Sequence, residues 1–159
     1  HLIGQGYRTF GYIGSQGGSD LRAKKRFEAF ATVLREAGAQ LVAVREAEGE
    51  SSMGVGRKMT DEVLRAKDPP RAIYYANDDL AAGGMMHCLA ENVAMPGDVA
   101  LAGFNGLGFL DSLPLKLTTT VTPRFEIGKE AATWLASSAP SGTATGALLE
   151  ARLDVGETT

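Results

Sequence analysis

The stretch AIYYANDDLAAGG, residues 72–84, decides the fold class because it joins a strand pattern to a helix pattern. Its five apolar or aromatic residues at 72–76 have the length and composition of a buried strand, and a run of small residues closes the stretch. Between them stand Asn77, Asp78 and Asp79. We expect Asp78 or Asp79 to cap the following helix. The other carboxylate and the amide would then be available to hydrogen-bond a ligand.

The alternation of strand and helix continues in both directions from this stretch. Strands are predicted at 10–14, 41–46, 72–76 and 99–104, with further ones at 117–120 and 148–155. Helices are predicted at 21–37, 53–65, 79–91 and 123–135. Repeated alternation of this kind favours an α/β fold, with a doubly wound parallel sheet and helices on both faces.

Polar residues follow most of the predicted strands. They are Ser15, Gln16, Glu48, Ser51, Asn77, Asp78, Asp79, Asn105, Thr122 and Arg124. In a parallel sheet the carboxyl ends of the strands meet at one edge, where ligands of such folds bind. The sequence therefore predicts a site for a small polar ligand at that edge.

The composition is that of one globular domain and argues against several classes of function. The chain has 159 residues, 44% of them hydrophobic, and a formal net charge of -3. A pI near 5.4 argues against nucleic-acid binding by this segment itself, because phosphate contacts need a basic surface. The longest apolar runs are too short to span a bilayer, so no membrane association is predicted. The single Cys88 suits a reducing cytoplasm.

The sequence offers little support for catalysis, a metal or a cofactor. The glycines at 11–18 lack the spacing of a dinucleotide fingerprint. His87 and Cys88 are adjacent on a predicted helix and point in different directions, so we expect no metal site and a structural Cys88. An α/β enzyme using Asp78 or Asp79 remains an alternative, although it lacks a nucleophile–base pair.

Five segments, in order, resemble the lac-repressor/galactose-repressor family of bacterial transcription regulators. They are HLIGQGYRTFGYIG at 1–14, RFEAF at 26–30, AIYYANDDLAAGGM at 72–85, VAMPGDVALAGFNG at 93–106 and LTTTVTPRFEIGKEAA at 117–132. The resemblance implies the C-terminal subdomain of a type I periplasmic-binding-protein-like fold. Residues 1–120 would form this effector-binding subdomain. Residues 121–145 would form a returning helix and linker of the N-terminal subdomain, and 146–159 a closing strand. The DNA-binding headpiece is expected to lie outside this fragment.

The resemblance also implies which residues contact an effector. Arg26, Asn77, Asp78 and Asn105 match effector-contact positions, while Thr122 or Arg124 lies at the crossover between subdomains. The family usually has Asp where this chain has Asn105, and Arg124 is a second departure. One negative charge fewer and one positive charge more favour an anionic ligand. The segments AGFNG and TPR look most like gluconate-utilisation repressors, so a sugar acid such as gluconate is the expected effector.

The resemblance implies a cytoplasmic, sugar- or sugar-acid-responsive repressor that reaches operator DNA through its headpiece. A periplasmic sugar-binding protein of an uptake system is the alternative. Repressors of this family form homodimers, and we expect a two-fold contact through Ala82, Met86, Phe109 and Leu110. The alternative for these residues is that they only cover the core. We also expect helix 123–135 to pack poorly against the rest of the fragment.

Overall fold

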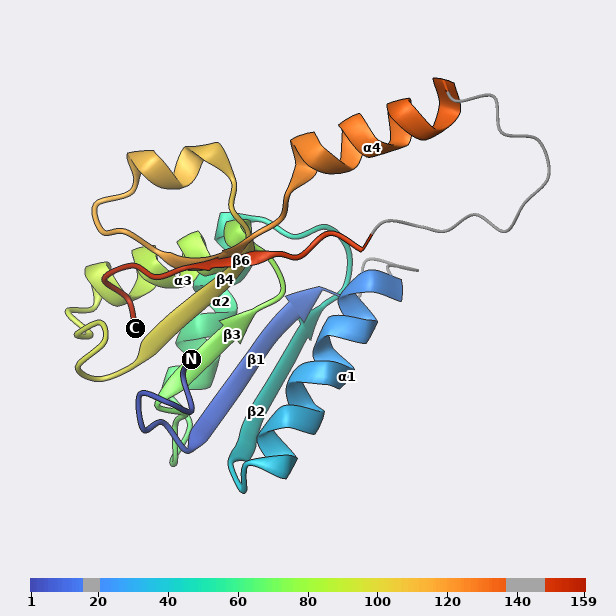
Figure 1. The fold of residues 1–159 in the computed structure, drawn as a ribbon. Coiled ribbons are helices and arrows are strands. Elements are labelled where there is room, and N and C mark those ends of the chain that lie inside the picture. Colours follow the sequence, from blue (N-terminus) through green and yellow to red (C-terminus); the bar gives the residue numbers. More distant parts are fainter. Residues whose placement is uncertain (16–20, 137–147) are drawn as a thin grey trace.

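The computed structural model describes residues 1–15, 21–136 and 148–159, which form a six-stranded sheet with helices on both faces (Figure 1). The strands are β1 (Thr9–Ser15), β2 (Gln40–Ala47), β3 (Ala72–Tyr75), β4 (Ala100–Asn105), β5 (Thr118–Val121) and β6 (Arg152–Asp154). The helices are α1 (Leu21–Glu36), α2 (Met53–Leu64), α3 (Asp78–Ala90) and α4 (Arg124–Ala136), and a 3-10 turn, η1 (Gly108–Ser112), follows β4.

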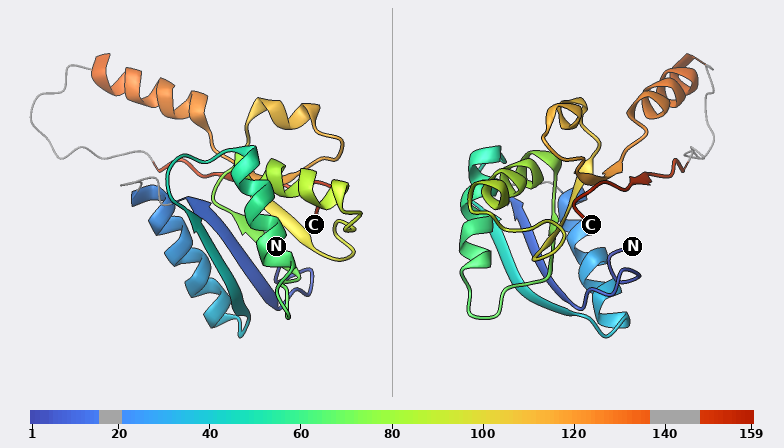
Figure 2. Two further views of the ribbon diagram at one scale, coloured as in Figure 1. Left: turned by 180° about the vertical axis from the view of Figure 1, so that it is seen from behind. Right: turned by 90° about the vertical axis from the view of Figure 1, so that its left-hand side faces the viewer.

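The sheet has the predicted doubly wound parallel form. Its strand order is β2-β1-β3-β4-β5-β6, and every neighbouring pair from β2 to β5 is parallel. The last strand, β6, runs antiparallel to β5 and is shorter than the predicted 148–155. Helix α1 covers one face of the sheet, while α2 and α3 cover the other (Figure 2). The carboxyl ends of β1, β3, β4 and β5 therefore share one edge.

The core lies on the three central strands because both faces of these strands are covered. Phe10 and Ile13 of β1, Ile73 and Tyr75 of β3, and Leu101 of β4 have no exposed surface. Strands buried on both faces are expected to be continuous apolar runs, which is how these segments read in the sequence. The core thus holds the strand ends in fixed positions.

Helices α2 and α3 pack so closely that glycine is required on both. A Cβ at Gly56 would lie 2.1 Å from the Leu80 carbonyl oxygen, and one at Gly83 would lie 2.0 Å from the Met53 carbonyl oxygen. The small residues of α3 thus allow close approach of α2 in the same chain. Ala82 has no exposed surface, so its predicted place in a contact between subunits is wrong.

Helix α4 extends away from the sheet, as the sequence predicts for 123–135 (Figure 1). None of its residues is buried. Its large apolar side chains are exposed: Phe125, Ile127, Trp134 and Leu135. Residues 137–145 of the predicted linker lie outside the described residues. An apolar helix surface of this size is typical of a surface that another part of a protein covers.

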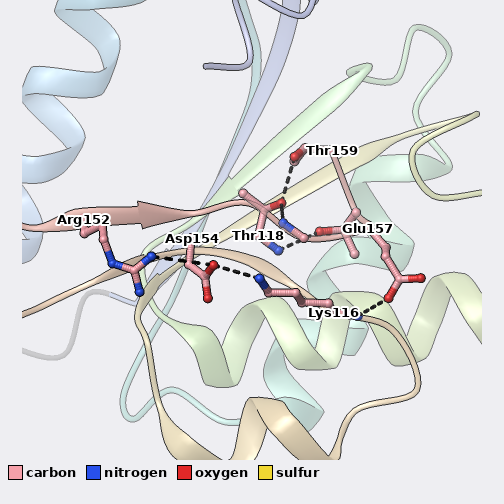
Figure 3. Close-up of polar contacts among 8 residues, drawn as sticks. Lys116, Thr118, Arg152, Asp154, Glu157 and Thr159 are labelled. Atoms are coloured by element: carbon pink, nitrogen blue, oxygen red, sulfur yellow. Dashed lines mark hydrogen bonds and ion pairs between the residues drawn. The ribbon is translucent and has the colours of Figure 1, made fainter.

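The last residues of the chain are tied into the sheet by hydrogen bonds and an ion pair (Figure 3). The Thr118 N–H donates to Thr158 Oγ1 at 3.0 Å, and the Thr158 hydroxyl donates to the Leu101 carbonyl at 2.8 Å. Lys116 Nζ lies 2.8 Å from Asp154 Oδ1. These contacts fix β6 beside β5, the strand that leads into α4.

Candidate functional site

A cavity of about 360 Å³ opens at the carboxyl edge of the sheet. Its lining comes from the end of β1, from α1, from the loop before α2 and from the end of β3. The polar members of this lining are Ser15, Arg26, Glu50, Ser51 and Asn77. Two of the predicted site residues, Arg26 and Asn77, thus meet in one cavity. Gln16 lies outside the described residues.

Asn77 is fixed by its own helix. Its Oδ1 accepts a hydrogen bond from the Leu80 N–H at 3.0 Å and so caps α3. Its Nδ2 donates to Ser51 Oγ at 2.7 Å, which joins the ends of two strand–helix units. The expectation that Asp78 or Asp79 caps this helix is therefore wrong, because Asn77 has the extended backbone of an N-cap residue and Asp78 is already helical.

Arg26 reaches the cavity from α1 and is held by an aromatic ring. Its guanidinium carbon lies 4.2 Å from the centre of the Phe104 ring, within cation–π range. Its Nη2 lies 3.4 Å from the Ala76 carbonyl oxygen, a long hydrogen bond. Its Nε is buried and finds no hydrogen-bond partner among the described residues. A buried donor without a partner is costly, and Arg26 as a whole lines the cavity.

Tyr74 adds to the surroundings of Arg26. Burial raises the pKa of the Tyr74 phenol, and the positive charge and hydrogen bond of Arg26 partly oppose that rise. The phenol is therefore neutral at physiological pH and does not neutralise the guanidinium. Among the described residues, no carboxylate lies within ion-pair distance of Arg26, which leaves its charge available to an anion.

Asp78 lies beneath the site and not in it. The residue has no exposed surface, and both of its carboxylate oxygens accept hydrogen bonds from the protein. The donors are the Thr119 hydroxyl at 2.5 Å and the Leu107 N–H at 2.9 Å. The predicted direct contact between Asp78 and an effector is therefore wrong. As the first residue of α3, directly after Asn77, Asp78 directs its side chain inward to Thr119 of β5 and to the loop after β4.

Asn105, Thr122 and Arg124 come together where β4 and β5 end. The Asn105 carbonyl accepts from the Thr122 hydroxyl at 3.2 Å and from its N–H at 3.3 Å. Arg124 is exposed, and its Nη2 donates to the Gly106 carbonyl at 2.9 Å. None of these three residues lines the cavity, but Phe104, which precedes Asn105 on β4, contacts Arg26, so the group and the cavity lie at the same edge of the sheet. The structure thus brings together five of the six predicted residues around one edge.

His87 and Cys88 have structural positions. Both are buried in α3, and burial raises the pKa of the Cys88 thiol to about 11, so the thiol is a poor nucleophile at neutral pH. Within the described ranges, no three His, Cys, Asp or Glu side chains are grouped so as to hold a metal ion. Among the helices of the described residues, none is long and apolar enough to cross a membrane.

Two contributors to the site were not among the residues expected to contact an effector. Phe104 was interpreted only as the end of a strand, and no local pattern marks it as a support for an arginine on another element. Ser51 was named among the polar residues that follow the predicted strands, but no effector contact was assigned to it. Only the folded structure identifies these two residues: Phe104 contacts Arg26, and Ser51 contacts Asn77.

The fold and the cavity are those of a ligand-binding domain, in which amide, hydroxyl and guanidinium groups meet at the carboxyl ends of parallel strands. The chain belongs to the family of periplasmic binding protein-like domains, whose model matches residues 1–159. The predicted fold class is thus confirmed, and so is the resemblance to lac-repressor/galactose-repressor regulators.

The relatives of this chain are transcription regulators. It is 32% identical over 137 residues to the HTH-type transcriptional regulator GntR of Pseudomonas aeruginosa, a match covering 83% of this chain and 38% of the relative. A LacI-family transcriptional regulator from Silicibacter pomeroyi superposes with a TM-score of 0.91 at 36% identity, covering 99% of this chain and 48% of that one. The transcription regulator GntR from Chromobacterium violaceum superposes with a TM-score of 0.87 at 31% identity. This match covers 99% of this chain and 59% of that one. The chain thus spans less than two thirds of the length of each of these relatives.

Proposed function

We propose that the intact protein is a sugar-acid-responsive transcriptional repressor and that this chain forms much of its effector-binding and dimerisation region. The relatives named as transcription regulators support a repressor over a periplasmic uptake component. Operator DNA would be bound by a headpiece outside this chain, in keeping with the acidic character of the segment itself. A protein that binds operator DNA would act in the cytoplasm.

The observation that carries the sugar-acid assignment is the state of Arg26. Arg26 lines the cavity, and no carboxylate among the described residues, Glu50 of the same lining included, lies within ion-pair distance of its guanidinium. A carboxylate ligand can accept from a guanidinium through charge-assisted hydrogen bonds. Asn77 and Ser51 supply amide and hydroxyl groups for the hydroxyls of the same ligand. A polyhydroxy carboxylate such as gluconate suits this combination.

Asn105 and Arg124 extend the proposed site along the edge. Asn105 replaces a carboxylate that would repel an anion, and its side chain can donate as well as accept. Arg124 is exposed and already donates to the Gly106 carbonyl, so we assign it a secondary, longer-range contribution. Thr122 holds the Asn105 backbone and supports the site without needing to contact the effector itself.

The intact protein is expected to bind gluconate at least about tenfold more tightly than glucose, because losing one charge-assisted hydrogen bond costs roughly 1.5–3 kcal/mol. Isothermal titration calorimetry with both ligands under the same buffer and salt conditions measures this preference. Equal affinities would contradict the sugar-acid assignment while leaving the repressor assignment in place. A thermal-shift panel of sugars and sugar acids then identifies the preferred effector.

We also propose that the protein is a homodimer that uses Met86 of α3 together with Phe109 and Leu110 of η1. Met86 is exposed, and the two η1 residues are half-buried, so each has apolar surface to contribute. Ala82 is omitted because it has no exposed surface. Apolar patches at the surface are typical of interfaces, and two-fold contacts are the commonest symmetric arrangement.

Combining Met86→Glu with Phe109→Glu is expected to convert the intact dimer into monomers, because four like charges would enter an apolar two-fold contact. Sedimentation velocity over a range of protein concentrations measures the change. Val44→Glu on β2 is the matched control, since Val44 is 38% exposed and Met86 is 37% exposed. A doubly substituted protein that stays dimeric would contradict the proposed interface.

A further inference from the structure

Asp78 is a buried charge at a junction of three elements. It stands at the start of α3, and its carboxylate accepts from Thr119 on β5 and from the Leu107 N–H just after β4. A buried carboxylate is costly unless its oxygens are hydrogen-bonded, so a fully bonded one holds its donors firmly in place. The three elements are therefore tied together beneath the edge of the sheet.

The fold leaves room for this carboxylate at Gly103. A Cβ at Gly103 would lie 2.5 Å from Asp78 Oδ1 and 3.2 Å from the Ala81 Cβ. Any larger residue at this position in β4 would displace the carboxylate or the helix. The approach of Asp78 to β4 thus depends on a particular glycine, which indicates a specific contact.

Asn105 is held between two ties. Its φ angle of 125° is one that side-chain-bearing residues rarely adopt, so its neighbours must hold the backbone in place. On one side, Thr122 donates twice to the Asn105 carbonyl. On the other, Asp78 binds the Leu107 N–H, two residues further along the chain. The direction of the Asn105 side chain depends on both.

We propose that Asp78 is a positioning residue, which holds the turn at 105–107 so that Asn105 is presented to the effector. This inference rests on the proposed effector-binding function and assigns Asp78 a role without contact to the ligand. It replaces the direct contact that the family resemblance implied. Asp78 then acts on affinity only through Asn105, which distinguishes positioning from general support of the fold.

The test is a double-mutant cycle on the intact protein, read by calorimetry with gluconate. Asp78→Asn keeps the size of the side chain but replaces one acceptor oxygen with an amino group that cannot accept from Leu107 or Thr119. We expect gluconate binding about tenfold weaker in Asp78→Asn, and no further loss when Asp78→Asn is added to Asn105→Ala. Losses that simply add would overturn the proposal.

Two further variants separate positioning from stability. Thr119→Ser retains the hydroxyl and is expected to keep the affinity, whereas Thr119→Val removes it and is expected to weaken binding as Asp78→Asn does. Thr60→Val is the control, because its buried hydroxyl bonds to Tyr75 and to the Gly56 carbonyl on the α2 side of the core. It should lower Tm and leave the affinity unchanged. Equal loss of affinity in Thr60→Val would overturn the proposal.

Hydrogen–deuterium exchange without ligand makes the tie measurable even if gluconate does not bind. Peptides covering 104–112 should exchange faster in Asp78→Asn than in the wild type or in Thr60→Val. Unchanged exchange in Asp78→Asn would overturn the proposal. A wild-type protein that binds no sugar acid would contradict the proposed function, while the exchange comparison would still decide whether Asp78 holds this turn.

Discussion

Replacing Gly83 by alanine is expected to lower the free energy of unfolding by about 3 kcal/mol, because the added methyl group has no space. Its Cβ would lie 2.0 Å from the Met53 carbonyl oxygen and 2.8 Å from the Arg57 nitrogen. Both contacts are backbone atoms of α2, so relief requires the two helices to separate. Urea denaturation followed by circular dichroism measures the change.

The matched control for this prediction is Gly54→Ala, the same substitution on α2. A Cβ at Gly54 would meet only Ser52 Oγ, at 3.8 Å, which is ordinary van der Waals contact. Alanine is the better helix former by up to about 1 kcal/mol, so Gly54→Ala should leave stability unchanged or raise it slightly. Gly83→Ala with wild-type stability would mean that α2 and α3 do not pack as closely as described.

The second large effect is expected at Arg26. Arg26→Gln removes the charge while keeping a long polar side chain, and it should weaken gluconate binding about tenfold to a hundredfold. Binding of glucose should change much less, because a neutral sugar makes no charge-assisted contact with the guanidinium. The preference between the two ligands, measured by calorimetry, is therefore the quantity to follow. An unchanged preference would contradict the role of Arg26.

Two other substitutions make the Arg26 result interpretable. Arg124→Ala should reduce the preference by a smaller factor, since Arg124 is exposed and its Nη2 is engaged with Gly106. Lys24→Ala removes a charge from the exposed face of the same helix and should have no effect, because Lys24 does not line the cavity. A loss in Lys24→Ala equal to that in Arg26→Gln would point to long-range attraction and not to direct contact.

Much of the fold was predictable because the patterns that decide it are local. The buried strands at 10–14, 41–46, 72–76 and 99–104 have continuous or alternating apolar residues, and each matches an observed strand to within two residues. The 3-10 turn η1 was not predicted, because its apolar residues follow no helical or strand period. Helix α4 was predicted with nearly its observed bounds, together with its lack of buried residues.

The site was predicted less completely because neighbouring candidates compete for the same roles. Three consecutive residues, Asn77, Asp78 and Asp79, can all cap a helix, and the backbone conformation that selects Asn77 is not visible in sequence. The small residues of α3 were expected to face another subunit. In the structure, α3 packs against α2, where Gly56 lies close to the Leu80 carbonyl oxygen. Contacts of this kind join distant segments, so no local pattern shows them.

The exposed position of Trp134 on α4 has a practical consequence for spectroscopy. It is the only tryptophan in the chain, whereas Tyr12, Tyr74 and Tyr75 lie in or against the core. Fluorescence excited at wavelengths that only tryptophan absorbs therefore comes from α4 alone. The wavelength of maximum emission reports the solvent exposure of the indole ring. Tyrosine emission comes largely from the sheet. One sample thus carries two intrinsic fluorescence probes. Tryptophan emission reports whether another surface packs on α4, and tyrosine emission reports whether the core is folded.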